Sequence, residues 1–599
     1  MPRIFKYFKW HDVLTIVFIG GFVVLQVWLE LLMPEYMIKA TEFSFTGAQP
    51  VLPDIWLNGG IMLACAAGGL ACALATIYLA TRMSSGFAAR LAQLIFERVE
   101  SFSAEEISRF STPSLITRTT NDVVQVRMLT GMGTHLLLRA PIMAVWALYK
   151  IGANTWEFIT LTAAVICVML SLVLFVVLAV LPKFRRIQTL TDSLNRLTRE
   201  NLTGIRVIRA FNAEQFQEER FERANQDITK TQLFTTRTMQ ALMPAMMLLL
   251  TGLTLGISVI GAFLIHGAAP VAGAGQSEIL GAAAAQGALY GDMLAFSQYA
   301  MMALTSFLMM VMVFIMLPRA AVSARRIMEV LDTKPAILSG AGAQDNPART
   351  GEVEFRGVSF KYPGAEEYVL ADISFSVKQG ETAAFIGSTG SGKSTLINLV
   401  PRFYDACEGE VLVEGVNVKQ YTLPQLTDKL GYVPQKGVIF SGTLRENVDF
   451  GAKEPPLTDE EIARALTLAQ AKEFTDTLQD GYEAKLARGG TNLSGGQQQR
   501  LSIARALARK RSILIFDDSF SALDFKTDKK LRAAINTELS GVTKLIVAQR
   551  IGTIKEADKI VVLEKGRAVG IGKHAELLKT CEVYREIALS QFSKEELGL

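Results

Sequence analysis

The chain of 599 residues is long enough for more than one domain. Half of its residues are hydrophobic and its mean hydropathy is +0.28, which is high for a soluble protein. Its formal net charge of +4 does not indicate a nucleic-acid-binding protein, and its five cysteines show neither metal-ligand spacing nor a disulfide framework.

Six long apolar runs precede residue 320, and each is near the ~20 residues that a helix needs to cross the core of a bilayer. They cover approximately residues 12–33, 58–80, 134–152, 157–181, 241–266 and 292–317. A single run of this kind is consistent with a buried core helix, but six in series predict an all-α membrane domain over residues 1–318. The first run is too long for a signal sequence, so we expect it to be retained.

The distribution of lysine and arginine predicts the orientation in the membrane. The first ten residues, "MPRIFKYFKW", combine basic and aromatic side chains and resemble an amphipathic elbow helix at the cytoplasmic interface. The connections after the second and fourth runs are long and basic, whereas those after the first, third and fifth are poor in basic residues. We therefore expect a multi-pass protein of the plasma (inner) membrane with both termini cytoplasmic. Residues 267–291 are expected to form a flexible external loop.

The two basic connections have a helical pattern, so the membrane helices are expected to continue into the cytoplasm, turn and return. The composition predicts turning points at residues 111–123 and 208–221. Residues 319–350 are polar and are predicted to be a linker. From residue 351 to residue 599 the pattern alternates between strand-like and helical, which is typical of a soluble α/β domain.

A glycine-rich segment, "GSTGSGKST", follows the apolar stretch "TAAFI" and fits the G-x-x-x-x-G-K-[ST] pattern of a P-loop. Glycines allow backbone N–H groups to surround phosphate oxygens, the lysine adds a cation, and the following hydroxyls face magnesium and the helix N-terminus. A chance glycine-rich turn is improbable at this spacing. The predicted phosphate-binding residues are Gly387, Ser388, Thr389, Gly390, Ser391, Gly392, Lys393, Ser394 and Thr395.

Other motifs accompany the P-loop. Tyr362 is a candidate for stacking on an adenine ring, although an ordinary strand tyrosine is the alternative, and the Gln435 amide is able to contact magnesium or water. The apolar strand "ILIF" ends at Asp517, a magnesium-binding position. A second helix start capable of facing phosphate is formed by Leu493, Ser494, Gly495, Gly496 and Gln497. Two such helix starts are most simply explained by a head-to-tail dimer in which each covers the nucleotide of the other chain.

Together these motifs resemble the ATP-binding cassette (ABC) transporters, specifically the half-transporters of the exporter (type IV) fold, over nearly the whole chain. The resemblance implies ATP and Mg²⁺ as cofactors, with Ser394, Gln435 and Asp517 at the metal. It also implies a lipid bilayer and a second half-transporter as partners. Asp524 in "SALD" corresponds to the D-loop aspartate at the dimer interface, and the two turning points would contain the coupling helices.

Three positions depart from the family pattern. Asp518 stands where the family has a catalytic glutamate, and Gln549 stands where it has a histidine. Aspartate is one methylene shorter, by ~1.5 Å, and glutamine cannot carry a proton near neutral pH. Arg488 stands where exporters usually have a glutamate near the coupling helices. The signature Leu493–Gln497 is nevertheless intact, so the chain resembles the degenerate-site subunit of heterodimeric bacterial multidrug exporters.

The sequence thus predicts a subunit that holds ATP at a slow site and completes the hydrolytic site of a partner with its signature. Methionines 301, 302, 309, 310, 312 and 316 favour an apolar or amphipathic cargo, although ordinary packing explains most of them. Glu30 is expected to line a cavity, contact cargo or pair with another helix, and Arg139 to face a partner or reach the interface. An exporter-fold importer, a slow homodimer and a non-pumping ATP-gated regulator remain alternatives.

Overall fold

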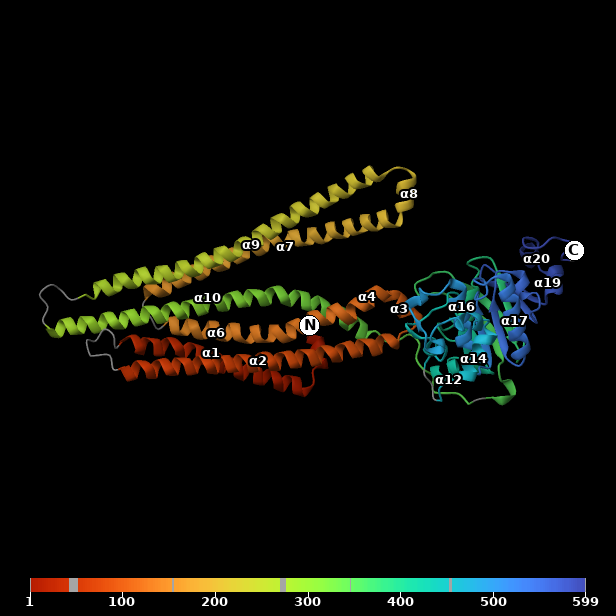
Figure 1. Cartoon of the computed structure of the whole chain (residues 1–599), viewed down its shortest axis with the longest axis horizontal. Helices are drawn as coiled ribbons and strands as arrows, with labels where there is room; N and C mark the ends of the chain where they lie inside the picture. The colour runs from red at the N-terminus through yellow and green to blue at the C-terminus, as the bar shows by residue number, and fades with distance from the viewer. Residues whose placement is uncertain are drawn as a thin grey trace. The chain divides into compact units, whose positions relative to one another are not determined.

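The computed structural model describes residues 2–42, 52–152, 156–269, 276–344, 346–451 and 455–597. The chain forms two compact units (Figure 1). One contains Met1–Arg98 and Leu115–Asp332 and is helical. The other contains Val99–Ser114 and Thr333–Leu599 and holds the β-sheets.

The helical unit is built around six helices that are long and apolar enough to cross a membrane, which confirms the predicted architecture. The third of them is a continuous helical run from Thr112 to Gly152 that includes two π-helical turns, η2 (Arg118–Asp122) and η3 (Leu129–Gly133). The elements are η1 (Pro2–Tyr7), α1 (Trp10–Glu42), α2 (Leu52–Glu100), α4 (Thr112–Thr117), α5 (Val123–Met128), α6 (Thr134–Gly152), α7 (Trp156–Thr203), α8 (Ile205–Ala210), α9 (Glu214–Gly267) and α10 (Gln276–Asp332).

Apolar side chains from α1, α2, α6, α7, α9 and α10 form the core of the helical unit. The Phe158 and Phe296 rings stack within this core, with their centroids 4.9 Å apart. Helices α7 and α9 run beside each other and are joined by the short helix α8 (Figure 1). Many leucine, valine and phenylalanine side chains on the outside of these helices are exposed, which suits a surface that lipid rather than water surrounds.

An ion pair crosses the apolar region of the helical unit. Arg139 Nη2 on α6 donates to both carboxylate oxygens of Glu30 on α1, at 2.9 Å each. Gln26, one helical turn before Glu30, donates to Glu30 Oε1 at 2.9 Å. Of the roles that the sequence left open for Glu30, the structure therefore assigns pairing between helices. A charge in this environment is costly unless it is compensated, and the guanidinium compensates it.

Two expectations about connections were wrong. Residues 276–291 are not a loop, because α10 begins at Gln276, while residues 270–275 lie outside the described residues. The small residues of this segment, mostly alanine, are good helix formers. The predicted linker 319–350 is helical up to Asp332, since the segment after Pro318 keeps a helical pattern of apolar residues. The irregular segment therefore begins at Thr333.

The first turning point was also misplaced. Residues 112–123 are helical. The helical path breaks instead at residues 101–103 and at Ser111, on either side of the short helix α3 (Ala104–Phe110), which a capping box of Ser103 and Glu106 starts. Ser111 then adopts a left-handed backbone angle, φ 61°, and the next helical run begins at Thr112. The second break lies at residues 211–213, inside the predicted 208–221.

The α/β unit contains a six-stranded sheet of order β12-β11-β3-β10-β9-β6 and a four-stranded antiparallel sheet of order β2-β1-β4-β5. In the larger sheet only the β11–β12 pair is antiparallel among the described strands. The strands are β1 (Val353–Phe360), β2 (Leu370–Val377), β3 (Thr382–Gly387), β4 (Glu408–Val413), β5 (Val416–Asn417), β6 (Leu430–Val433), β7 (Gly442–Thr443), β8 (Lys485–Leu486), β9 (Ile513–Asp517), β10 (Thr543–Val547), β11 (Lys559–Glu564) and β12 (Arg567–Gly572).

Helices pack on this framework over two apolar cores, and the parallel strands contribute to both. The strands are therefore buried on both faces and read as continuous apolar runs in the sequence. The helices are α11 (Lys393–Asn398), α12 (Leu423–Lys429), α13 (Leu444–Val448), α14 (Asp459–Leu468), α15 (Lys472–Thr475), α16 (Gly495–Leu507), α17 (Phe525–Glu538), α18 (Ile551–Ile554), α19 (His574–Thr580) and α20 (Glu582–Leu589), with 3-10 turns η4 (Pro347–Arg349), η5 (Gly481–Glu483) and η6 (Arg488–Gly490).

The register of the parallel strands determines where polar side chains meet. Val547 on β10 pairs with Asp517 on β9 and with Phe385 on β3, and Val433 on β6 pairs with Phe516. The carboxyl ends of β3, β6, β9 and β10 consequently lie at one edge of the sheet. Ligands in open α/β sheets bind at this edge, so the loops that follow these strands define the candidate site.

Candidate functional site

The loop between β3 and α11 has the backbone of a phosphate cradle. Gly390 and Gly392 have φ values of 83° and 96°, which side chains rarely tolerate. At Gly387 a Cβ atom would collide with the carbonyl oxygen of Leu563, so only glycine fits. The Ser391 hydroxyl is buried and has no hydrogen-bond partner within the part of the chain that the structure describes. This combination fits a loop that receives phosphate oxygens.

Lys393 and Ser394, the first two residues of α11, lie next to the carboxylates that follow β9. Lys393 Nζ donates to the carbonyl oxygens of Gly387 and Ser388, at 2.9 and 2.8 Å. Burial lowers the pKa of Lys393, while the nearby Asp518 and Asp517 carboxylates act in the opposite direction. Ser394 Oγ donates to Asp517 Oδ1 at 2.7 Å. A hydroxyl and a carboxylate brought together in this way are the donor set that Mg²⁺ prefers, so the residues fit this ion.

The two consecutive aspartates differ in their surroundings although both are 6% exposed. Burial raises the pKa of Asp517, and the hydrogen bond from Ser394 opposes the shift. Burial also raises the pKa of Asp518, against hydrogen bonds that lower it. The side chain of Asp518 accepts from Gln549 Nε2 at 2.8 Å and, more weakly, from Gln435 Nε2 at 3.4 Å, both at Oδ2. Its backbone is left-handed, φ 47°, which is uncommon for a residue with a side chain.

Tyr362 lies against the same helix. Its hydroxyl is within hydrogen-bond distance of Thr395 Oγ1, at 2.9 Å, and its ring packs edge-on against Phe360 and Tyr404. The side chain is 37% exposed, so part of it is accessible. Tyr362 is therefore adjacent to the phosphate cradle, as adenine stacking requires, but its use for adenine stays a prediction.

The signature residues begin a different helix. Ser494 is the N-cap of α16, with a capping box formed between Ser494 and Gln497. Ser494 and Gly495 are exposed. Among the described residues no hydrogen bond joins Leu493–Gln497 to the P-loop residues 387–395. Asp524 caps α17 by accepting from the Thr527 backbone at 2.9 Å, and Arg488 is an exposed residue at the start of η6.

The structure thus brings Lys393, Ser394, Gln435, Asp517, Asp518 and Gln549 together at one edge of the sheet and leaves the signature apart from them. Two glutamines that the sequence did not single out also contact this region. Gln499, which is 1% exposed, donates to the carbonyl oxygen of Pro434, next to Gln435, at 3.1 Å. Gln591 binds the backbone on both sides of Arg550. Gln499 is 65 residues from Pro434, and Gln591 is 42 residues from Gln549 and 40 from Ile551. No spacing rule in the sequence indicates contacts over such separations.

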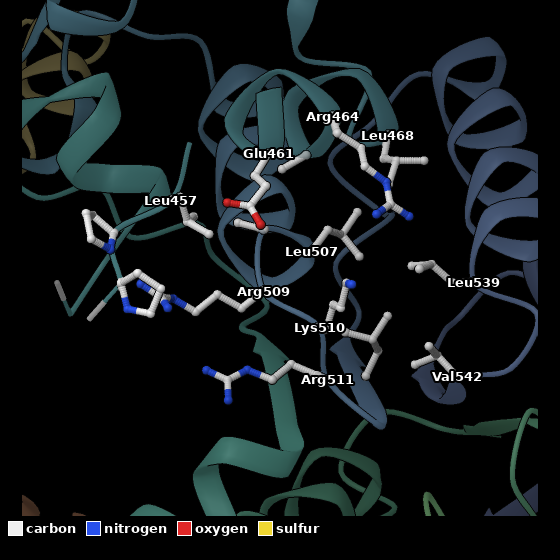
Figure 2. A pocket seen from close by; sticks show the side chains of 15 residues that line it. Leu457, Glu461, Arg464, Leu468, Leu507, Arg509, Lys510, Arg511, Leu539 and Val542 are labelled. Atoms are coloured by element: carbon white, nitrogen blue, oxygen red, sulfur yellow. The ribbon is translucent and has the colours of Figure 1, made fainter. Parts of the chain in front are cut away.

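A hollow of about 670 Å³ lies elsewhere in the α/β unit and is lined by residues of α14, the end of α16 and the start of β9. Figure 2 shows the side chains that line it. None of the P-loop residues lines it. Its three arginines are already paired, Arg464 with Glu538 at 3.9 Å, Arg509 with Asp449 at 2.5 Å and Arg511 with Asp428 at 3.2 Å. The hollow lacks the cluster of P-loop, aspartate and glutamine side chains that meets at the strand ends. We therefore do not place the nucleotide site in this hollow.

Two family models match the chain, that of the ABC transporter transmembrane region over residues 16–274 and that of the ABC transporter over residues 370–521. An uncharacterized ABC transporter ATP-binding protein of Mycobacterium tuberculosis is 38% identical over 550 residues, 90% of each chain. The uncharacterized ABC transporter ATP-binding protein YfiB of Bacillus subtilis is 34% identical over 95% of this chain and 94% of its own length. The ATP-dependent lipid A-core flippase of Aromatoleum aromaticum is 32% identical over 91% and 88%.

A solved structure of a bacterial Atm1-family ABC exporter with ATP bound has a similar fold, with a TM-score of 0.74. The similarity covers 97% of this chain and 99% of that chain at 23% sequence identity, so it concerns the fold alone.

Proposed function

We propose, because this chain belongs to the ABC transporter family as an exporter-fold half-transporter, that it is the degenerate-site subunit of a heterodimeric ATP-driven exporter. In this proposal the chain binds ATP and Mg²⁺ at its own P-loop, hydrolyses that ATP slowly, and completes the partner's hydrolytic site with its signature. It lies in the inner membrane with both termini in the cytoplasm, and its cargo is apolar or amphipathic.

The observation that carries the proposal is the hydrogen bond of 2.8 Å from Gln549 Nε2 to Asp518 Oδ2. A carboxylate that orients an attacking water must reach toward the terminal phosphate, and Asp518 is shorter than glutamate by ~1.5 Å. Its Oδ2 is in addition engaged by the amides of Gln549 and Gln435. An error of about 1 Å in such a group can cost on the order of 10²-fold in rate. The amide of Gln549 is also unable to carry the proton that a histidine would carry.

The groups that hold nucleotide are in contrast complete. Lys393 supplies a cation, the glycines allow the backbone conformation of a phosphate-binding loop, and Ser394 with Asp517 supplies oxygen ligands. Bound magnesium would neutralise phosphate charge at this position. These residues bind and orient ATP without Asp518, so the pocket retains a nucleotide that it cleaves slowly.

The signature is suited to serve another chain. Ser494 and Gly495 are exposed at the start of a 13-residue helix, whose N-terminal N–H groups and dipole favour phosphate. Closure of two α/β units head to tail would place this helix start over the partner's ATP. Asp524, which is exposed at the next helix start, would lie at the same interface.

Exposed aromatic side chains at the junction of α8 and α9 support a second subunit as partner. Phe211 is 79% exposed and Phe216 is 65% exposed, and Val207 beside them is 61% exposed. These side chains lie in the segment predicted to contain a coupling helix, and an exposed apolar cluster at a connection between helices is typical of a docking surface. In our proposal it docks on the partner's nucleotide-binding domain.

The cargo is proposed to be amphipathic or lipid-like on two grounds. Met301, Met302, Met309 and Met310 are half-buried along α10, and flexible thioether side chains adapt to varied apolar ligands. Relatives at 32% identity are named ATP-dependent lipid A-core flippases.

The decisive experiment compares ATP turnover of the purified full-length chain alone and after co-expression with a second half-transporter that carries glutamate and histidine at the positions of Asp518 and Gln549. We expect little turnover from the chain alone and robust turnover from the pair. In the pair, Ser494→Ala should lower turnover by about 10²-fold, as loss of one transition-state donor does. Asp518→Ala, the matched change at the chain's own site, should lower it less than about twofold.

A chain that alone hydrolyses ATP as fast as the pair would refute the degenerate-site assignment and indicate a homodimer. Equal losses from Ser494→Ala and Asp518→Ala would show that both sites hydrolyse ATP. Transport of a fluorescent lipid into inside-out vesicles would indicate export, whereas loss of preloaded lipid from them would indicate import.

A further inference from the structure

The loop that carries Gln549 is held by a side chain from the far C-terminal segment. We call residues 548–551, between β10 and α18, the switch loop. Gln591 Nε2 donates to the carbonyl oxygen of Gln549 at 2.8 Å, and Gln591 Oε1 accepts from the N–H of Ile551, also at 2.8 Å. One amide group therefore bridges the backbone on both sides of Arg550.

This bridge replaces a missing helix cap. The first N–H groups of a helix have no partner inside the helix and are usually satisfied by the N-cap side chain. Arg550 is the N-cap of α18 and makes no such hydrogen bond. Gln591 accepts from Ile551 in its place, so the start of α18 depends on a residue 40 positions further along the chain.

The segment that carries Gln591 is itself anchored. Its N–H donates to the carbonyl oxygen of Ala588 at 3.1 Å, which continues the end of α20. The next residue, Phe592, packs on the same apolar core as Ile551 and Ile554, and its ring lies near Gly552. Leu597 also packs against this core, and Ser593 and Glu596 form reciprocal hydrogen bonds between them. Gln591 is thus presented to the switch loop from a fixed support.

We propose that Gln591 is a positioning residue for the nucleotide site, an inference that rests on the function proposed above. Gln591 fixes the backbone of the switch loop, and the loop in turn fixes the Gln549 amide on Asp518 Oδ2. The reach of residue 549 toward the terminal phosphate of ATP is then set by a contact outside the pocket. Loss of the bridge should destabilise the ordered conformation of the loop by about the free energy of one hydrogen bond. It removes no group that touches nucleotide.

The first measurement is hydrogen–deuterium exchange of the full-length chain in lipid nanodiscs. Gln591→Leu removes both hydrogen bonds, and we expect about three- to tenfold faster exchange in the peptide that covers the switch loop. Gln591→Glu keeps the acceptor for Ile551 but loses the donor to Gln549, so we expect a smaller increase. The P-loop peptide should not change, and neither should the switch loop in Gln379→Leu, an exposed glutamine used as the control.

The second measurement separates positioning from simple stability. In the Asp518→Glu/Gln549→His background, where the chain's own site is expected to turn over, Gln591→Leu should lower kcat by about three- to tenfold and leave KM within about twofold. Gln591→Glu should give an intermediate kcat. If Gln591 had only a structural role, Gln591→Leu would instead lower the melting temperature or the amount of nucleotide bound.

Unchanged exchange in the switch loop of Gln591→Leu would overturn the inference, and so would an unchanged kcat in the restored background. If Asp518→Glu/Gln549→His does not raise turnover at all, the proposed function fails at that step. The exchange rates of the switch loop, which need no hydrolysis, then decide by themselves whether Gln591 fixes the loop.

Discussion

Two carboxylates, one in each unit of the molecule, are held in opposite ways. Glu30 in the helical unit accepts two hydrogen bonds of 2.9 Å from the Arg139 guanidinium, so its charge is compensated by a cation. Asp518 in the α/β unit is held at Oδ2 by the amides of Gln549 and Gln435, which carry no charge. Burial correspondingly raises the pKa of Asp518.

The difference distinguishes a carboxylate that joins two helices, Glu30, from one that lies at the proposed nucleotide site, Asp518. A carboxylate that is neutralised by arginine is fixed in place and useful for joining helices in a membrane. A carboxylate held only by amides keeps its charge and repels phosphate unless a cation arrives with it. In the same pocket Lys393 and the pair Ser394–Asp517, proposed to bind magnesium, would provide for phosphate. The side chain of Asp518 is hydrogen-bonded to amides, and the nearby Lys393 ammonium opposes the rise of its pKa without outweighing burial. The predictions below test each side of this comparison.

The largest effect is expected at the compensated carboxylate. Arg139→Met leaves Glu30 without its cation inside the apolar region. The two side chains are 19% and 23% exposed, so we expect a cost of about 3 kcal/mol, the lower end of the range for breaking a buried pair. We expect a marked loss of folded, monodisperse protein and a melting temperature lower by about 5 °C or more. Fluorescence-detected size-exclusion chromatography after heating measures both.

The control for this prediction is the double variant Glu30→Gln/Arg139→Met. It removes both charges, so it should recover most of the lost stability, because neutral replacement of an ion pair is often harmless. If the double variant is as unstable as Arg139→Met, the pair is not the source of the effect. If Arg139→Met is stable, the contrast between the two carboxylates is wrong on the membrane side.

The membrane helices and the P-loop were predictable because their signals are local. Twenty apolar residues in a row predict a span, and the spacing from Gly387 to Thr395 indicates a phosphate-binding turn whatever surrounds it. The positions of the helix breaks were harder to predict from the sequence. The capping box of Ser103 and Glu106 was present in the sequence and predicts the break at residues 101–103, but it lies in a segment dominated by helical periodicity.

Long-range contacts were not predictable in the same way. The sequence raised pairing as one role for Glu30, but the choice of Arg139 depends on how α1 and α6 pack. Likewise Asp518 and Gln549 were identified one by one as departures from a family pattern. Their hydrogen bond to each other, and the support from Gln591, arise from strand register and from a C-terminal segment that carries no motif.

A smaller effect, about tenfold or more, is expected when the uncharged partners of residue 518 are changed. Asp518→Glu/Gln549→His restores a longer carboxylate and a residue that can be protonated, so ATP turnover by the chain alone should rise. Single-turnover hydrolysis with radiolabelled ATP measures the step directly. Asp517→Glu is the matched control, because it lengthens the neighbouring carboxylate, which is proposed to bind magnesium with Ser394, and it should lower turnover. Unchanged hydrolysis in the double variant would refute the geometric explanation of a slow site.

The smallest effect is a change in stability that depends on pH. Because burial raises the folded-state pKa of Asp518 above its unfolded value of 3.8, the ionised side chain destabilises the fold at neutral pH. This cost disappears as pH falls through the folded-state pKa toward the unfolded one. Asp518→Asn keeps an acceptor for Gln549 but cannot ionise, so the melting temperature should rise by about 2 °C at pH 7.5, and less as the pH approaches 4.

Asp524→Asn, in the same α/β unit, is expected to change the melting temperature in the opposite direction. A hydrogen bond from Thr527 lowers the pKa of Asp524, so its favourable contribution is present above 3.8 and is lost only as pH falls through the lowered pKa. Its replacement should therefore lower the melting temperature by a similar amount at pH 7.5 and at pH 5. Differential scanning fluorimetry of the full chain across this range compares the two variants. If the gain from Asp518→Asn does not shrink as the pH falls, Asp518 is compensated after all, and the contrast with Glu30 is lost.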